Sequence, residues 1–237
     1  MVKRSKRYNQ TLEKIDVNKQ YSPTDAVGMV KDNATAKFDE SIELHLKTSA
    51  DSTQADQLIR GVVVLPHGVG KTPVVAVFVE GESATIANES GADFVGGDDL
   101  IKKVESGWTE FDVSIATPEM MGKVGRLGRV LGRKGLMPNP RTGTVVPSDD
   151  IPRAITEAKK GRVEYRLDRS SLIHVPIGKA SFDEEQLLDN LSSVMDAIVQ
   201  ARPAGLKGQY IRSSFIKSTM GPSVRINVAE LTELEVE

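Results

Sequence analysis

The sequence predicts a mixed fold, in which an α+β domain made from both ends of the chain is split by an inserted Rossmann-like α/β domain. Residues 73–118 alternate short apolar strands with short helices, a rhythm typical of a parallel sheet. Both flanking parts instead combine amphipathic helices with strands in which apolar and polar residues alternate. Two linkers, near residues 66–71 and 145–150, separate the two patterns, which indicates two domains joined by two hinges.

The N-terminal part of the split domain contains one predicted helix and two predicted strands. Ser22 and Pro23 start a helix within residues 21–36, where apolar side chains recur at helical spacing. The segment SIELHLKT, residues 41–48, alternates apolar and polar side chains, which indicates a half-buried strand. RGVVVLP, residues 60–66, is a second and more continuously apolar strand.

The inserted domain is predicted to contain three strands, each followed by a helix. The strands are PVVAVFVE, ADFVGG and FDVSIATP, and the first is apolar throughout, as expected of a parallel strand covered on both faces. Helices follow each strand, over residues 83–91, 99–107 and 118–128.

The C-terminal part returns to the α+β pattern. A helix starts at Ser148, presents one apolar face and ends at Gly161. The strands RVEYRLD and SLIHVPIGK are predicted to pair through a turn at Asp168, and residues 183–203 form a strongly amphipathic helix. QYIRSSFIKST and SVRINVAE form a last pair around a turn at Met220.

These boundaries place the split domain at residues 1–67 and 159–237 and the inserted domain at 68–158. The junction sequence HGVGKT resembles a phosphate-binding loop, but that loop requires a glycine where this chain has Leu65. A strand follows instead of the helix whose N-terminus would hold the phosphate. Gly68 and Gly70 are therefore interpreted as hinge residues, because glycine permits large changes of backbone angle.

The composition excludes several classes of function. The chain has no cysteine, and its three histidines are too far apart in sequence to suggest a zinc site, so no metal or cofactor is expected. No apolar run has the length of a membrane span, which predicts a cytoplasmic protein. Neither a Gly-x-Gly-x-x-Gly fingerprint nor a nucleophile elbow is found, so we expect neither an enzyme nor a small-molecule substrate.

Charge is segregated along the chain, although its formal net value is only −2. Basic residues start the chain, at Lys3, Arg4, Lys6 and Arg7, and return between residues 202 and 225. Acids concentrate in residues 80–112 and in the closing glutamates. Such segregation allows a locally basic surface on a slightly acidic protein.

The segment RLGRVLGRKGLMPNP, residues 126–140, is the most basic run. We interpret it as a glycine-spaced loop whose cations and backbone amides approach phosphates. The alternative is a solvent-exposed helix end with capping glycines. The segment alone does not separate RNA from DNA or from an acidic protein partner. Its candidate contacts are Arg126, Arg129, Arg133, Lys134 and Arg141.

Two further segments suit RNA. In STMGPS, the Thr219 hydroxyl can reach a ribose or phosphate, and the flexible Met220 thioether can adapt to a base or sugar face. Lys37 and Phe38 combine a cation with a group that stacks on bases. The alternative for STMGPS is a plain turn. The alternative for Phe38 is a residue at the edge of the core.

Taken together, the segments ATAKFDESIEL, QLIRGVVVLPHGVGK, GRLGRVLGRKGLMPNPRTGT, HVPIGKASF and STMGPSVRIN resemble the L-one family of large-subunit ribosomal proteins. The similarity runs in order from about residue 3 to residue 228. One departure is Arg133, which stands where family members usually have proline.

The resemblance implies a monomeric protein outside the ribosome that binds the stalk region of large-subunit ribosomal RNA, near the site where deacylated tRNA leaves. It also implies repression of the protein's own mRNA, and a location in the cytoplasm on the ribosome. The RNA contacts that the resemblance implies are Lys37, Phe38, Arg166, Lys179, Ser213, Thr219, Met220 and Gly221, with lesser contacts from the basic segment of the inserted domain. The hypotheses from other classes are a nucleotide-dependent α/β enzyme that uses Lys71 and a protein–protein adaptor.

Overall fold

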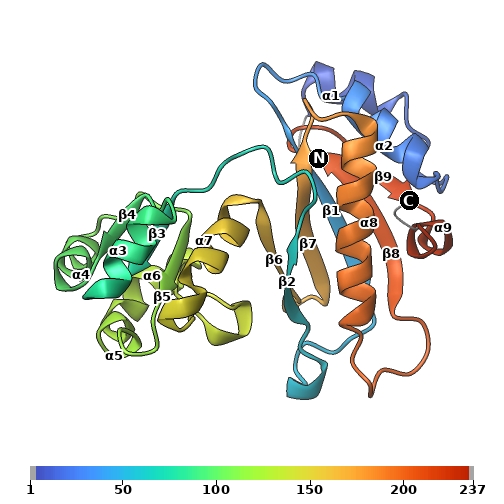
Figure 1. Cartoon of the computed structure of the whole chain (residues 1–237). Helices are drawn as coiled ribbons and strands as arrows, with labels where there is room; N and C mark the ends of the chain where they lie inside the picture. The colour runs from blue at the N-terminus through green and yellow to red at the C-terminus, as the bar shows by residue number, and fades with distance from the viewer. Residues whose placement is uncertain (1–3, 235–237) are drawn as a thin grey trace. The chain divides into compact units, whose positions relative to one another are not determined.

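The structure, a computed structural model, describes residues 4–234 and is a mixed α/β fold with several sheets, as predicted (Figure 1). Lys3 of the basic start and two of the closing glutamates, Glu235 and Glu237, lie outside these residues. Contacts divide the described chain into two compact units. The first contains the residues up to Gly70 and those from Val163 onward, and the second is Lys71–Arg162.

The first unit is built on an antiparallel sheet with the strand order β7-β1-β8-β9. Two further strands, β2 and β6, form a separate two-stranded sheet. The elements of this unit are α1 (Lys6–Leu12), α2 (Pro23–Asp32), β1 (Ser41–Thr48), a 3-10 turn (Ala55–Gln57), β2 (Arg60–Val64), β6 (Arg162–Arg166), β7 (Leu172–Lys179), α8 (Glu184–Gln200), β8 (Ile211–Ser218), β9 (Val224–Ile226) and α9 (Val228–Thr232).

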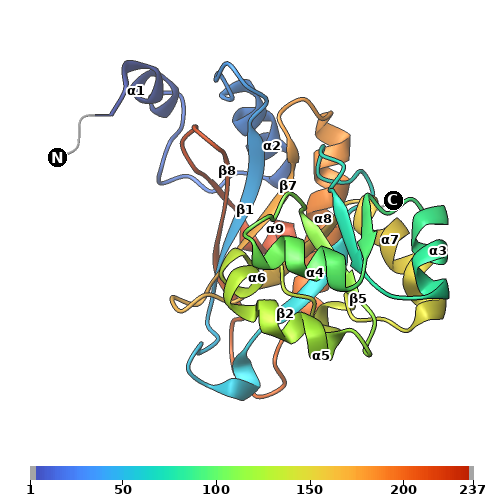
Figure 2. The same ribbon diagram turned by 90° about the vertical axis from the view of Figure 1, so that its left-hand side faces the viewer.

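Alternation along β1 decides which face of this sheet is covered. Ile42, Leu44 and Leu46 are completely buried in one core with the apolar faces of α2 and α8. Figures 1 and 2 show both helices on the same side of the sheet. The residues between them on β1, which include Glu43 and His45, are partly exposed on the other side. We call that other side the open face.

The second unit contains a parallel sheet with the strand order β4-β3-β5. All four residues of β3 are fully buried, and their side chains divide between two clusters, so the predicted parallel strand covered on both faces is confirmed. The elements are β3 (Val75–Phe78), α3 (Glu82–Glu89), β4 (Phe94–Gly96), α4 (Asp98–Glu105), β5 (Val113–Ala116), α5 (Met121–Val124), a 3-10 turn (Gly125–Leu127), α6 (Gly128–Lys134), two 3-10 turns (Pro140–Thr142 and Ser148–Asp150) and α7 (Ile151–Lys159).

The predicted pairing of RVEYRLD with SLIHVPIGK is wrong. Both segments are strands, but β6 pairs with β2, whereas β7 pairs with β1. Between the two segments only the bridge Leu167–Ile173 forms. The Asp168 carboxylate accepts hydrogen bonds from the backbone N–H groups of Ser170 and Leu172, at 2.8 and 2.7 Å, and makes a tight turn. The turn is therefore as expected, but it leads from one sheet into another.

The interpretation of residues 126–140 as a basic loop is also wrong for most of the segment. Arg129, Arg133 and Lys134 lie on α6, which Gly135 ends in the left-handed conformation with φ of 72°. Leu127 and Leu131 are buried four residues apart, and their burial favours a helix over a loop. The alternative of a helix end with a capping glycine is the correct one. Helices α1 and α9 were not predicted at all.

Gly61 on β2 is required by a close approach that the sequence pattern does not reveal. A Cβ atom at this position would lie 2.4 Å from the Tyr165 hydroxyl oxygen. That hydroxyl donates a hydrogen bond to the Ala197 carbonyl of α8, at 3.0 Å. We expect Gly61→Ala to lower the free energy of unfolding by about 1–3 kcal/mol, since a well-packed side chain has to move. Guanidinium denaturation followed by circular dichroism measures it.

Gly132→Ala on α6 is the matched control, because a Cβ atom there meets nothing within 4 Å. Alanine in the interior of a helix adds about 0.5–1 kcal/mol relative to glycine, so this variant should be stabilised. Trp108, the single tryptophan, lies in the second unit with Gly132, and its fluorescence reports the unfolding of that unit. Equal effects of the two substitutions would contradict the role given to Tyr165.

Candidate nucleic-acid interface

Six of the eight residues expected to contact RNA come together at one end of the antiparallel sheet. The start of β1, the end of β7 and the end of β8 meet there, because Ser41 pairs with Lys179 and Ile42 pairs with Ser218. We call the six residues the turn cluster: Lys37, Phe38, Lys179, Thr219, Met220 and Gly221.

Ser41 joins two members of the turn cluster. Its backbone N–H donates to the Thr219 hydroxyl at 2.9 Å, and its backbone carbonyl accepts from the Thr219 N–H at 2.9 Å. The Lys179 ammonium donates to the Ser41 hydroxyl at 2.8 Å. The polar groups of Thr219 and Lys179 are therefore already used within the protein, where they fix the positions of the strand ends.

Glu40 holds the two chain segments of the cluster together. Its side chain is 1% exposed, and one carboxylate oxygen accepts from the Ala36 N–H while the other accepts from the Met220 N–H, both at 2.8 Å. Burial acts to raise the pKa of Glu40, but these two backbone donors, with smaller contributions from Ser218 and Arg7, hold it below its ordinary value. The carboxylate is therefore ionised at neutral pH. It was not among the expected residues, because nothing in KFDES distinguishes it from Asp39.

The apolar members of the cluster face solvent. The exposed fractions of Phe38 and Met220 are 54% and 52%, and Lys37 beside Phe38 is exposed as well. Gly221 completes the turn at a position where a Cβ atom would lie 2.5 Å from the Ser218 hydroxyl oxygen. A cation, an aromatic ring and a thioether on a fixed turn can pair with phosphates and stack on unpaired bases.

Arg166 and Ser213 do not join the turn cluster. Arg166 is the exposed last residue of β6, in the two-stranded sheet. Ser213 lies near the start of β8, opposite Lys47, so it is at the other end of β1 from Ser41. Their assignment as RNA contacts stays a prediction.

The open face between these two ends carries a histidine pair that was missed. His45 and His174 are directly opposite each other on β1 and β7, and their Nδ1 atoms are 2.6 Å apart. Burial, together with the charges of His174 and Lys217, lowers the pKa of His45, while Glu43 opposes this shift. Strand pairing brings the two rings together, although 129 positions separate them in the sequence.

The basic residues expected to make lesser contacts are all exposed on the second unit: Arg126, Arg129, Arg133, Lys134 and Arg141. Lys134 donates to the Thr109 hydroxyl. Within residues 4–234, no ion pair occupies the guanidinium groups of Arg126, Arg129 or Arg133. These three side chains are therefore available to an anionic partner.

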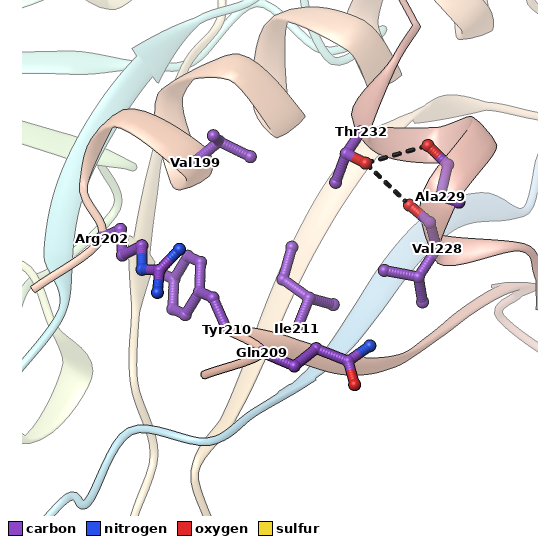
Figure 3. A pocket seen from close by; sticks show the side chains of 8 residues that line it. All are labelled: Val199, Arg202, Gln209, Tyr210, Ile211, Val228, Ala229 and Thr232. Atoms are coloured by element: carbon purple, nitrogen blue, oxygen red, sulfur yellow. Dashed lines mark hydrogen bonds between the residues drawn. The ribbon is translucent and has the colours of Figure 1, made fainter. Parts of the chain in front are cut away.

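A cavity of about 330 Å³ in the first unit is the main alternative to an RNA-binding surface, because it could hold a small molecule (Figure 3). Two of its polar side chains are occupied, whereas the buried Tyr210 hydroxyl has no hydrogen-bond partner among the described residues. Arg202 donates to the carbonyls of Leu206 and Gly208, and the Thr232 hydroxyl bonds to its own helix. Burial, aided by Tyr165 and opposed by Arg202, raises the pKa of Tyr210 to about 12. The cavity thus offers no group ready for acid–base chemistry near neutral pH.

The nucleotide-binding alternative also lacks support. The Lys71 ammonium contacts both carboxylate oxygens of Asp112, at 2.8 and 2.9 Å, instead of being free for a phosphate. The chain then enters strand β3 at Val75, not a helix. Among the residues that the structure describes, no group of three or more metal-ligating side chains is found, and no helix is long and apolar enough to cross a membrane.

Replacing Glu40 tests how the cluster is held. We expect Glu40→Gln to lower the free energy of unfolding at neutral pH by about 1–3 kcal/mol, because an amide replaces a carboxylate that accepts two backbone hydrogen bonds. The pKa of Glu40 is lowered in the fold, so its contribution is complete above its ordinary pKa of 4.5 and is lost as the pH falls through the lower, folded-state pKa. Denaturation of both proteins at neutral and acidic pH measures this dependence.

The control for this experiment is Asp39→Asn at the neighbouring, exposed carboxylate, which accepts hydrogen bonds from the Ser181 N–H and hydroxyl, at 3.1 and 2.8 Å. It should have a smaller effect. A difference between wild type and Glu40→Gln that stays constant down to acidic pH would contradict the role assigned to the charge.

Comparison of the chain with known proteins identifies its family. The model of the "Ribosomal protein L1p/L10e family" matches residues 30–222. The chain is 52% identical to "Large ribosomal subunit protein uL1" of Dehalococcoides mccartyi (strain ATCC BAA-2266 / KCTC 15142 / 195), over 99% of both chains. It is 55% identical to the protein of that name from Thermomicrobium roseum, over 98% of this chain and 97% of the relative. For the Limosilactobacillus reuteri protein the identity is 53%, over 95% and 97%.

These relatives are named as ribosomal proteins and not as enzymes, in agreement with the expectation from the sequence. The match covers the turn after β8 up to Pro222 as well as the segment before β1, and therefore includes the whole turn cluster. The chain belongs to the ribosomal protein L1p/L10e family.

Proposed function

We propose that the chain binds the stalk region of large-subunit ribosomal RNA, with the turn cluster as its main recognition surface. The observation that carries this proposal is the exposure of Phe38 and Met220 on segments that the buried Glu40 carboxylate holds in place. The backbone that carries them is held before RNA arrives, which lowers the conformational entropy lost on binding. RNA loops present unstacked bases to such a surface.

The proposal includes two finer roles that follow from the family resemblance. On the ribosome in the cytoplasm, the protein assists the release of deacylated tRNA from the large subunit. Outside the ribosome it is a monomer that represses translation of its own mRNA by binding a similar RNA element. One rigid surface suits both RNAs, because it reads local shape and phosphate positions.

The proposed domains remain residues 1–67 with 159–237 and residues 68–158. They are joined by two linkers, and the first of these bends at Gly68 and Gly70. Both glycines have positive φ values, 67° and 75°, which other residues adopt rarely. Gly68 is held by the Asn190 side chain, which donates to its carbonyl at 3.0 Å. The bending is therefore proposed to centre on Gly70, where the division between the two units falls.

The basic helix α6 is proposed as a secondary, mainly electrostatic RNA contact. Its guanidinium groups supply phosphate attraction that is independent of sequence, whereas the turn cluster supplies specificity. An adaptor that binds an acidic protein through α6 would show no preference for stalk RNA at moderate salt. A nucleotide-dependent enzyme would show saturable nucleotide binding that Lys71→Ala abolishes.

Removing either exposed apolar side chain tests the main surface. We expect Phe38→Ala and Met220→Ala each to weaken binding to stalk RNA by about 1–3 kcal/mol, the effect of losing one stacked base or one good contact. Binding is measured at physiological salt, with an unrelated RNA hairpin as competitor.

Val17→Ala is the matched control, because Val17 is 64% exposed but lies outside the turn cluster. Its affinity for stalk RNA should equal that of the wild type. If all three variants bind equally well, the turn cluster is not the recognition surface.

Replacing Arg129 tests the secondary contact. We expect Arg129→Ala to weaken binding modestly and about equally for stalk RNA and the competitor hairpin. The slope of log affinity against log salt concentration should fall by about 1, because one phosphate contact is lost. A salt series on both proteins gives this slope. Loss of preference for stalk RNA in this variant would contradict the division between the two surfaces.

A further inference from the structure

The histidine pair on the open face has the arrangement of a chelating site. His45 and His174 occupy directly paired positions on β1 and β7, with their Nδ1 atoms 2.6 Å apart. The His45 side chain is 20% exposed and the His174 side chain 50% exposed, so a small ion can reach the pair from solvent. Both side chains stand on paired strands, which restricts their positions, although the pairing of β1 with β7 has a register shift between Ile42 and Glu43.

The second nitrogen of each ring faces a carboxylate. Nε2 of His45 is 3.5 Å from Glu43, and Nε2 of His174 is 3.8 Å from Asp168. In metal sites a carboxylate near the other ring nitrogen orients the histidine. Here neither contact is a hydrogen bond, and Nε2 of His45 has no hydrogen-bond partner among the described residues, so the two carboxylates contribute mainly negative charge. At 2.6 Å the two Nδ1 atoms share one hydrogen bond, in which one ring donates its N–H and the other accepts, so a bound metal ion takes the place of that proton.

We propose that His45 and His174 bind one divalent transition-metal ion between their Nδ1 atoms, with Cu²⁺ preferred, and with water in the remaining positions. Imidazole nitrogen is a favoured ligand of copper, nickel and zinc. The chain contains no cysteine, so no thiolate of its own competes for the ion or reduces it.

Geometry decides between these metals. Two metal–nitrogen bonds of about 2.0 Å that meet at a right angle, as in tetragonal Cu²⁺ and Ni²⁺ sites, separate their nitrogens by about 2.8 Å. A tetrahedral site such as that of Zn²⁺ needs about 3.3 Å. The observed 2.6 Å is the length of the hydrogen bond between the rings, so each of these ions requires the Nδ1 atoms to move apart, by less for the tetragonal arrangement than for the tetrahedral one.

The surroundings of the pair both support and limit binding. Lys217, whose ammonium lies 3.8 Å from the Glu43 carboxylate, is a positive charge near the site and opposes a cation. The two carboxylates compensate for it. Within residues 4–234 no third protein ligand joins the two histidines, so the ion should exchange readily with strong chelators.

The test is titration of the full chain, without RNA, with Cu²⁺, Ni²⁺ and Zn²⁺ separately near neutral pH, followed by calorimetry. We expect one equivalent of Cu²⁺ to bind, with affinity falling in the order Cu²⁺, Ni²⁺, Zn²⁺. His45→Gln and His174→Gln should each lose this binding. Glu43→Gln, which removes a negative charge beside the pair, should weaken it by about tenfold.

His67→Gln is the matched control, because His67 is the one histidine of the chain outside the pair and its Nε2 contacts the Asp189 carboxylate, at 2.8 Å. It should bind Cu²⁺ as the wild type does. Electron paramagnetic resonance of the copper complex should show coupling to two imidazole nitrogens in the wild type and in His67→Gln, and to fewer in the other histidine variants.

Equal Cu²⁺ binding in all histidine variants, or a stronger preference for Zn²⁺, would overturn the proposal. The unfolding transitions of the metal-free variants should match that of the wild type, so that loss of binding is not loss of fold. Because RNA is absent, failure of this experiment leaves the proposed RNA-binding function untouched.

Discussion

The site depends on one buried charge. The Glu40 carboxylate accepts the backbone N–H groups of Ala36 and Met220, and thereby ties the segment before β1 to the turn after β8. An ionised carboxylate without partners would be very unfavourable in this position, so the two donors and the carboxylate require one another. It thereby helps to position the backbone that carries the exposed Phe38 and Met220 side chains. Hydrogen bonds between Ser41 and Thr219 join the same two segments, so Glu40 strengthens a connection that the strand ends also make.

Charge placement explains how a chain with a net charge of −2 can present cationic surfaces. Many of the acids lie in the first turns of helices: Asp98 and Asp99 begin α4, and Glu184 and Glu185 begin α8. Negative charge is favourable at these N-termini because of the helix dipole. Those acids therefore stabilise helices, while Arg126, Arg129 and Arg133 are exposed and form no ion pair within residues 4–234.

The helical conformation of the basic segment changes how its cations are arranged. Arg126, Arg129 and Arg133 are three and four residues apart, a spacing that places side chains on one face of a helix. A loop would have presented backbone amides to phosphates, whereas a helix presents a row of guanidinium groups. Arg133, at the position where proline was expected from the resemblance, adds a charge to this row and is compatible with a helix interior that proline would disrupt.

The sequence by itself determined the local elements, because helix and strand patterns depend on neighbouring residues. SIELHLKT is β1, PVVAVFVE contains the buried β3, and STMGPS is the turn that carries Met220. Residue chemistry and the family resemblance also predicted the six residues of the turn cluster, and their contact with RNA stays a prediction. Only the tertiary structure decided that β6 pairs with β2, that Glu40 lies beneath Met220, and that His45 meets His174. These pairings join residues more than 90 positions apart, and they depend on packing and strand register, which local sequence patterns do not encode.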